Sequence, residues 1–307
     1  MSPVAAIETD RLSKVYPGGH GIEDVTMTVE AGEVFGFLGP NGAGKTTTIR
    51  ALLDLIHPTA GSARILGLDS RRDSVAIRRQ LGNLPGDFGF GRETTGRRAV
   101  ELMVRLRDGA DPARADELAQ RFRADLDRPL GELSRGNRQK IGLILAAFHR
   151  PALLVLDEPT GGLDPMMQEE FLGLVDEERD RGATVFLSSH ELDEVERICD
   201  RVGIVREGRL IAVERVPDLL GRARRKVTVR VSGQADLDDL RRVPGVVDPR
   251  AIEGGISFGF AGDLDPVVKA LAGFHVTDLE VSRPTLEEVF LGYYEGGSAD
   301  KGAGGST

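Results

Sequence analysis

A glycine-rich turn joins an apolar segment to a helix-prone segment in the stretch Val34-Phe-Gly-Phe-Leu-Gly39-Pro-Asn-Gly-Ala-Gly-Lys45-Thr46-Thr47. The apolar residues 34–38 have the length of a buried strand, and residues 46–55 have helical character. The turn between them fits the spacing G-x-x-x-x-G-K-S/T in the strand–turn–helix context that this motif requires. A chance glycine-rich turn rarely meets both conditions, so we interpret it as a phosphate-binding loop.

A loop of this kind binds phosphate through its main chain and through the start of the following helix. The glycines let successive backbone N–H groups turn inward around the anion, and the helix directs its positive N-terminal end at the same place. We expect Lys45 to pair with the β- and γ-phosphates and Thr46 to supply a hydroxyl ligand to Mg²⁺. The loop residues predicted to contact the nucleotide are Gly39, Asn41, Gly42, Ala43, Gly44, Lys45, Thr46 and Thr47.

A second apolar run ends in two carboxylates and reads Leu153-Leu-Val-Leu-Asp157-Glu158. Ligands of open parallel sheets bind at the carboxyl ends of the strands, where this pair is expected to lie. Asp157 is then placed to hold Mg²⁺, usually through water, and Glu158 to polarise a water for in-line attack on the γ-phosphate. An Asp-Glu pair often does no more than end a strand, but the phosphate-binding loop favours the catalytic interpretation.

The rest of the pattern predicts an α/β chain with a second, smaller domain. Residues 1–221 alternate apolar strands with helices, which favours a mainly parallel sheet with an additional antiparallel part. The Arg-rich, helix-prone region at about 87–150 is interpreted as a helical subdomain inserted between two halves of the sheet. Residues 222–294 predict the order β-α-β-β-α-β, which suggests a small ferredoxin-like α+β domain. The Gly/Ser-rich tail 295–307 is predicted to be disordered.

Composition excludes several classes of protein. The 307 residues are 40% hydrophobic and 29% charged, as in an ordinary folded domain. The net charge of −9 argues against a nucleic-acid partner, because binding phosphates usually requires a basic surface. The single cysteine, Cys199, excludes an internal disulfide framework. No apolar run approaches the ~20 residues that span a bilayer, and no signal peptide is recognisable. If the protein acts at a membrane, we therefore expect another chain to supply the membrane-spanning segments.

Further motifs resemble those of the ABC-type ATPases and follow in the order of that family. Residues 133–139 resemble the signature sequence of that family and read Leu133-Ser134-Arg-Gly136-Asn-Arg-Gln139. Residues 158–164 resemble its D-loop and read Glu158-Pro-Thr-Gly-Gly-Leu-Asp164. Ser188-Ser-His190 resembles the switch histidine after the next strand, and Tyr16 the aromatic residue that stacks on adenine. The resemblance covers about residues 5–220.

The resemblance implies ATP and Mg²⁺ as cofactors and a head-to-tail dimer that holds ATP between two subunits. Ser134 and Gly136 of one subunit would bind the γ-phosphate held by Lys45 of the other, at the N-terminus of a helix. His190 would contact the γ-phosphate and the water activated by Glu158. The resemblance thus implies Glu158, His190 and Lys45 as catalytic residues. Asp164 would join the two sites, and Tyr16 would stack on adenine, unless its ring serves only in packing.

The C-terminal stretch Ser282-Arg-Pro-Thr-Leu-Glu-Glu-Val-Phe-Leu291 resembles the extension of drug- and antibiotic-export ATPases that pair with ABC-2-type permeases. It implies an ATP-hydrolysing exporter subunit at the cytoplasmic face of the membrane. The cargo would be a drug, an antibiotic or a lipid-like molecule, and the second subunit a copy of itself or a paralogue. The alternative is a soluble ABC-type ATPase acting on ribosomes or DNA. An inactive homologue is disfavoured because Lys45, Asp157, Glu158 and His190 are all present.

Two positions depart from the family pattern. The signature carries Arg135 and Asn137 where Gly and Gln are commonest. The segment Leu81-Gly-Asn-Leu-Pro85-Gly86-Asp87 has Gly86 where the family usually carries a glutamine that reaches the Mg²⁺ and the water. Glycine cannot make those contacts, so either Asp87 substitutes for the glutamine or the main chain alone links the site to the permease.

Overall fold

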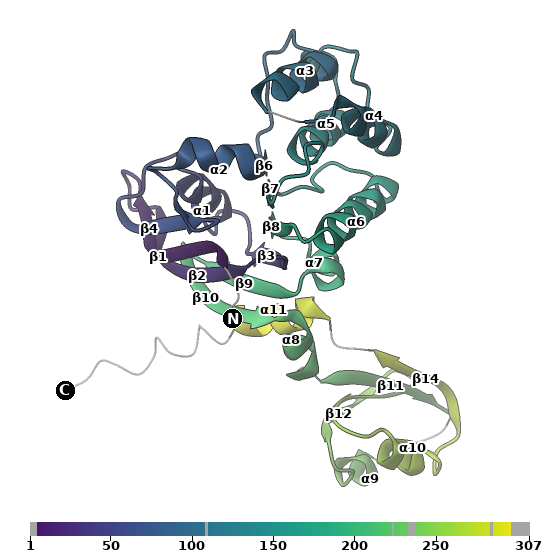
Figure 1. Cartoon of the computed structure of the whole chain (residues 1–307). Coiled ribbons are helices and arrows are strands. Elements are labelled where there is room, and N and C mark those ends of the chain that lie inside the picture. Colours follow the sequence, from purple (N-terminus) through teal and green to yellow (C-terminus); the bar gives the residue numbers. More distant parts are fainter. Residues whose placement is uncertain (1–4, 108–109, 223, 233–236, 283–284, 296–307) are drawn as a thin grey trace, which may run out of the picture. The chain divides into compact units, whose positions relative to one another are not determined.

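The computed structural model describes residues 5–107, 110–222, 224–232, 237–282 and 285–295, and the chain divides into two compact units (Figure 1). The units meet in sequence between Arg215 and Val216, whereas the pattern places the domain boundary at residue 221. The difference is the helix α8, Val216–Arg222, which packs against α11, Leu286–Glu295, within the second unit. Glu295 ends α11, and the rest of the tail predicted to be disordered, 296–307, lies outside the described residues.

A six-stranded sheet forms the centre of the first unit. Its strand order is β10-β9-β3-β8-β7-β6, and all neighbours pair in parallel except the antiparallel β9 and β10. Every residue of β3, β7 and β8 is buried, which is why these strands are nearly continuous apolar runs. The strands are β3 Val34–Leu38, β6 Leu81–Leu84, β7 Leu153–Asp157, β8 Thr184–Ser189, β9 Arg201–Arg206 and β10 Arg209–Arg215.

A second, antiparallel sheet supplies the additional β part. Its order is β2-β1-β4-β5, with β1 Ala5–Val15, β2 Gly21–Glu30, β4 Ala60–Ile65 and β5 Leu68–Asp69. Both sheets contribute to one apolar core, in which Ile7 and Val25 of the antiparallel sheet join Phe35 and Phe186 of the parallel one. The predicted α/β fold with a mainly parallel sheet and an antiparallel part is therefore confirmed.

Helices cover both sides of the parallel strands. Figure 1 shows α1 and α2 on one side of β3, β7 and β8, and α6 and α7 on the other. A separate group, formed by α3, α4 and α5, corresponds to the predicted helical subdomain. The helices are α1 Lys45–Leu52, α2 Ser74–Gln80, α3 Gly96–Leu106, α4 Pro112–Arg121, α5 Arg135–Ala147, α6 Pro165–Asp180 and α7 Leu192–Ile198, with a 3-10 turn at Leu130–Glu132.

The second unit is a four-stranded antiparallel sheet with two short helices between its strands. The strand order is β12-β13-β11-β14, and the chain order is β-α-β-β-α-β. Phe258, Phe260 and Val229 from the sheet pack with Val267 and Leu271 from a helix. The elements are β11 Arg225–Val231, α9 Leu237–Arg241, β12 Val246–Ile252, β13 Gly255–Phe260, α10 Asp265–Leu271 and β14 Val276–Ser282.

A half-buried histidine helps to attach the helical group to the edge of the parallel sheet. Arg107, which follows α3, donates one hydrogen bond to the carbonyl of Leu81 on β6 at 3.0 Å and contacts Nε2 of His149. A guanidinium only donates, so Nε2 accepts in the contact with Arg107, and Nε2 also lies 3.3 Å from the carbonyl oxygen of Leu81. Burial, together with the positive charge of Arg107, lowers the pKa of His149 from 6.5 to about 4.

This shift makes stability depend on pH with a definite sign. Between about 4 and 6.5 the unfolded chain binds a proton at His149 that the folded chain does not, so the free energy of unfolding falls as the pH falls through this range. We expect His149→Gln to remove that part of the acid sensitivity, measured by urea unfolding at several pH values. Replacing the exposed His20 by Gln is the control. An unchanged pH dependence in His149→Gln would contradict the assignment.

Candidate active site

The phosphate-binding loop needs glycine at several positions for different reasons. Gly42 and Gly44 have φ of 83° and 105°, a region that other residues rarely adopt. At position 39 there is no space for a side chain, because a Cβ on Gly39 would lie 2.6 Å from the carbonyl oxygen of Val205. Gly44 precedes the first residue of α1, Lys45, so the loop ends at a helix N-terminus. Ala43 is buried and Asn41 exposed, while Thr46 and Thr47 at the start of the helix are half-buried.

Three charged or titratable side chains from separate motifs meet beside this loop. The Nζ of Lys45 donates to the carbonyl of Gly39 at 2.6 Å and lies 3.0 Å from Oε1 of Glu158. The other carboxylate oxygen of Glu158, Oε2, lies 2.6 Å from Nδ1 of His190. Lys45 is only 6% exposed and His190 46% exposed, so the cluster runs from a buried cation to an accessible imidazole. The structure thus brings together the three residues expected to be catalytic.

The backbone of Glu158 is held in an unusual conformation. Its φ is 50°, in the left-handed region, which costs a residue with a Cβ about 1–2 kcal/mol. Its N–H donates to the Oγ of Ser188 at 3.0 Å, and its carbonyl accepts from Nε2 of Gln139 at 3.0 Å. Gln139 donates to the carbonyl of Pro159 as well, also at 3.0 Å. These contacts offset the strain and aim the carboxylate at Lys45 and His190.

The neighbouring carboxylate has the chemistry of a magnesium ligand. Asp157 is 1% exposed, and its Oδ1 accepts a hydrogen bond from the Oγ of Ser188 at 2.6 Å. The described residues contain no group of three or more His, Cys, Asp or Glu side chains arranged to hold a metal ion. Mg²⁺ is usually held by one or two carboxylates plus substrate phosphates, and Asp157 with the hydroxyl of Thr46 fits that requirement.

The signature residues Ser134 and Gly136 lie at the start of α5, where Gly136 abuts the loop after β7. Ser134 is the N-cap of α5 and accepts from the N–H of Asn137 at 3.2 Å. A Cβ on Gly136 would lie 2.4 Å from the carbonyl oxygen of Gly162, so only glycine fits against that loop. Asp164 is the N-cap of α6. Figure 1 shows α5 grouped with α3 and α4, apart from α1.

Tyr16 lies in the turn that joins β1 to β2. Its N–H donates to the carbonyl of His20 at 2.8 Å, and the Nζ of Lys14 lies 5.5 Å from the ring centroid. The residue is half-buried. The start of β2 adjoins the phosphate-binding loop, since a Cβ on Gly44 would lie 2.8 Å from the side chain of Ile22. The turn therefore leads directly to the loop, which is compatible with a role at the base of a nucleotide.

Two polar residues of this site were not recognised as functional in the sequence, although both lie within motifs quoted there. Gln139 and Ser188 have polar side chains, yet they are only 6% and 0% exposed. Buried polar side chains require partners, and here the partners are the main chain and carboxylate of the Asp157-Glu158 pair. Their positions in the motifs mark them, but only the tertiary contacts show what they hold.

Gln139 connects the signature helix α5 to Glu158, so its removal should slow hydrolysis. We expect Gln139→Leu to lower kcat about tenfold, since about 1.4 kcal/mol of lost transition-state stabilisation corresponds to that factor. ATP binding in the absence of Mg²⁺ should not change, because the residue does not touch the phosphate-binding loop. Lys140→Gln, one position further along α5, is the matched control. A wild-type kcat in Gln139→Leu would show that the two hydrogen bonds do not position Glu158.

Comparisons with known proteins agree with this geometry. Residues 22–161 match the family model described as ABC transporter. Among curated proteins, the chain is 37% identical over 300 residues to the daunorubicin resistance ATP-binding protein DrrA3 of Streptomyces coeruleorubidus, covering 93% of this chain and 95% of that protein. It is also 37% identical over 224 residues to the bacitracin transport ATP-binding protein BcrA of Bacillus licheniformis, covering 72% of each.

Solved structures show the same fold. An ATP binding subunit of an ABC transporter is 32% identical, with a TM-score of 0.63, over 70% of this chain and 91% of that one. The dimeric ATP-binding cassette MJ0796 shares the fold at 21% identity and a TM-score of 0.62, over 68% of this chain and 98% of that one. Both cover less of this chain than DrrA3, whose similarity extends into the second unit.

Proposed function

The chain belongs to the family of ABC transporter ATP-binding proteins, and from that premise we propose that it is the ATP-hydrolysing subunit of an exporter. The cargo would be a drug, an antibiotic or a lipid-like molecule, carried through a partner permease. The names of the relatives concern bacitracin transport and daunorubicin resistance, which favours export over work on ribosomes or DNA. The single observation that carries the proposal is the cluster of Lys45, Glu158 and His190 beside the glycine loop.

The cluster suggests how the site changes when ATP binds. Lys45 pairs with Glu158, and the γ-phosphate of ATP competes for the same ammonium group. Once Lys45 binds phosphate, Oε1 of Glu158 is free to accept the proton of the attacking water. The Nδ1 of His190 remains hydrogen-bonded to Oε2 of Glu158, and the imidazole is exposed enough to reach the phosphate. Asp157 and Thr46 would hold Mg²⁺, which neutralises charge on the β- and γ-phosphates.

A second subunit would complete the site. Ser134 and Gly136 lie at the N-terminus of α5, where the helix dipole and free N–H groups favour an anion. They do not face Lys45 within one chain, so the phosphate they bind would belong to the partner subunit. Asp164 lies at the next helix N-terminus along the chain and would contact the partner site. Tyr16 would stack on adenine.

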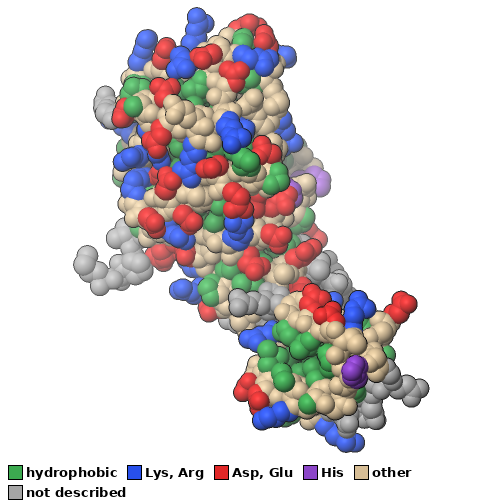
Figure 2. Space-filling model, turned by 90° about the vertical axis from the view of Figure 1, so that its right-hand side faces the viewer, with side chains coloured by type: hydrophobic (Ala, Val, Ile, Leu, Met, Phe, Trp, Pro, Cys, Tyr) green, Lys and Arg blue, Asp and Glu red, His purple; other side chains and the backbone are tan. Residues whose placement is uncertain are grey.

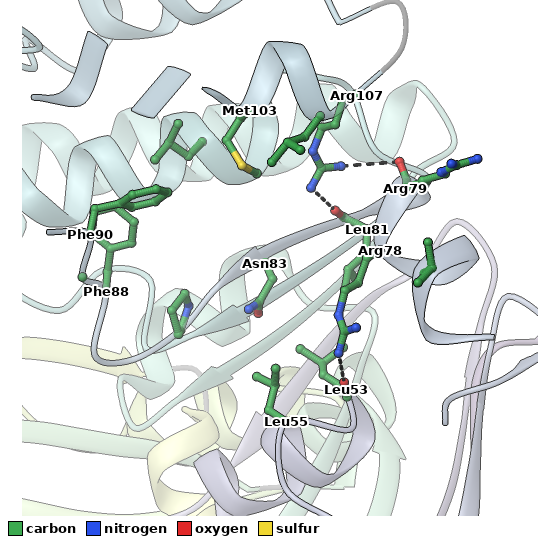
Figure 3. A pocket seen from close by; sticks show the side chains of 15 residues that line it. Leu53, Leu55, Arg78, Arg79, Leu81, Asn83, Phe88, Phe90, Met103 and Arg107 are labelled. Carbon is green, nitrogen blue, oxygen red and sulfur yellow. Dashed lines mark hydrogen bonds between the residues drawn. The ribbon is translucent and has the colours of Figure 1, made fainter. Parts of the chain in front are cut away.

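An apolar groove in the first unit is the proposed docking surface for an ABC-2-type permease. It has a volume of about 550 Å³ and lies between the β6 edge, α2 and α3 (Figure 3). Leu55, Val75 and Leu106 line it although each is more than half exposed, which is typical of an interaction site. Its other lining side chains include Leu53, Leu81, Phe88, Phe90, Met103 and Leu145, with Arg78, Arg79 and Arg107 among them.

The groove favours one kind of occupant, an amphipathic helix of the permease. Apolar side chains of such a helix would fill the groove, and acidic residues beside them would meet Arg79. Asn83 projects from β6 into the groove, and its buried Oδ1 has no hydrogen-bond partner among the described residues (Figure 3).

The permease would also determine where the protein works. In the part of the chain that the structure describes, no helix has the length and apolar character that a membrane span requires. The proposed location is the cytoplasmic face of the membrane, through contact with the permease. On the face that Figure 2 presents, basic and acidic side chains are interspersed, which does not favour nucleic acid as a partner.

Leu106→Glu tests the docking surface. The residue is 66% exposed and lines the groove, so a carboxylate buried there on docking should greatly reduce co-purification with a co-expressed candidate permease. The ATPase rate of the isolated subunit should not change. Val268→Glu, at a 54% exposed position of α10 in the second unit, is the control. Equal recovery of the permease with both variants would contradict the proposal, and co-sedimentation with ribosomes would support the alternative function.

A further inference from the structure

We propose that Gly86 is a positioning residue for the carboxylate of Asp157, and that this chain requires glycine where its family usually carries glutamine. The inference rests on the proposed role of Asp157 in holding Mg²⁺.

Gly86 lies directly against Asp157. It follows β6, whose Leu84 is paired with Leu156 on β7, so the chain leaves the sheet beside the end of β7. A Cβ on Gly86 would lie 2.9 Å from Oδ2 of Asp157 and 3.3 Å from its Cγ. A distance under 3.0 Å is shorter than real Cβ contacts, so any side chain at this position would force a displacement.

Backbone conformation does not explain the glycine. Gly86 is not among the glycines with positive φ, in contrast to Gly42 and Gly44 of the phosphate-binding loop. Any residue can adopt its φ, and what a side chain would lack is the space that Asp157 occupies. The steric contact with the carboxylate is therefore the reason for glycine here.

Asp157 has little freedom to move away. It is 1% exposed, and its Oδ1 is fixed by the hydrogen bond from the Oγ of Ser188 at 2.6 Å. Its strand β7 is paired with β6 on one side and β8 on the other. A methyl group on Gly86 would have to turn the carboxylate off the Ser188 hydroxyl or push the loop outward, and either change alters the metal-binding oxygen.

The structure also decides between the two ways in which this loop was expected to manage without glutamine. The side chain of Asp87 is 98% exposed, and its Oδ2 lies 3.7 Å from the guanidinium of Arg50. An exposed side chain beside Arg50 does not take the place of a glutamine at the buried Asp157. The contact that remains is that of the main chain at Gly86.

The same short loop forms part of the groove. Pro85, Phe88, Gly89 and Phe90 line the groove, and Gly86 lies between Pro85 and Phe88 in sequence. A helix that seats against Phe88 and Phe90 therefore bears on a segment whose other side abuts Asp157. In this chain the groove is connected to the metal-binding carboxylate by packing and not by a side-chain amide.

The test compares Gly86→Ala and Gly86→Gln with Gly89→Ala. Gly89 is in the same loop, has no positive φ, and a Cβ there would meet nothing within 4 Å. The readout is the affinity for Mn²⁺ in the presence of a non-hydrolysable ATP analogue, measured by electron paramagnetic resonance. Nucleotide affinity in EDTA and the melting temperature are measured on the same samples.

We expect both Gly86 variants to bind Mn²⁺ about tenfold or more weakly, because disturbing the supports of a metal ligand typically costs 10–100-fold in affinity. Nucleotide binding in EDTA should match wild type, and the melting temperature should fall by only about 2–4 °C, because disturbing the Ser188 hydrogen bond costs about 1 kcal/mol. Gly89→Ala should match wild type in every measurement. Wild-type Mn²⁺ affinity in Gly86→Ala, or a gain in Gly86→Gln, would overturn the inference. So would loss of folding or of metal-free nucleotide binding, because the role would then be structural only.

Failure of the proposed function would look different. In that case wild-type protein itself would show no Mn²⁺ binding that depends on the nucleotide, whatever the variants do. If wild type binds the metal and hydrolyses ATP but Gly86→Ala behaves identically, only the role of Gly86 is wrong.

Discussion

The structure depends on one ion pair, between the buried ammonium of Lys45 and the carboxylate of Glu158. A buried cation without a counter-charge is costly, so this pair requires the glycine loop and the end of β7 to lie within reach of each other. The parallel pairing of β7, β8 and β3 provides this, because all three strands end at the same edge of the sheet. His190 follows β8 and completes the cluster from that edge.

Much of the remaining site serves to hold the two residues at the end of β7. Ser188 binds the side chain of Asp157 and the main chain of Glu158, so one hydroxyl fixes the carboxylate of Asp157 and the backbone of Glu158. Gln139 reaches Glu158 from the signature helix, and Gly86 abuts Asp157 from the groove side. Phosphates bound by a partner subunit would thus act on Glu158 through the signature helix and Gln139. The helix of a permease would act on Asp157 through Gly86.

The sequence alone predicted the parallel sheet, the helical group and the phosphate-binding loop, since these depend on local periodicity and on spacing within motifs. The order β-α-β-β-α-β predicted over residues 222–294 is also the order of elements between β11 and β14 in the second unit. The helix α8 could not be assigned to its unit, because only packing against α11 places it there. Likewise, the meaning of Gly86 depends on an oxygen of Asp157, about seventy positions away in the chain, which no local pattern reveals.

The most direct test of the account is complementation between two inactive variants, Glu158→Gln and Ser134→Arg. Each homodimer lacks one component in both of its sites, whereas a mixed dimer keeps one site with an intact Glu158 from one subunit and an intact Ser134 from the other. The account predicts that mixing the two proteins restores ATP hydrolysis well above the mean of their separate rates. A mixture that shows only that mean, although mixed dimers are present, would contradict it.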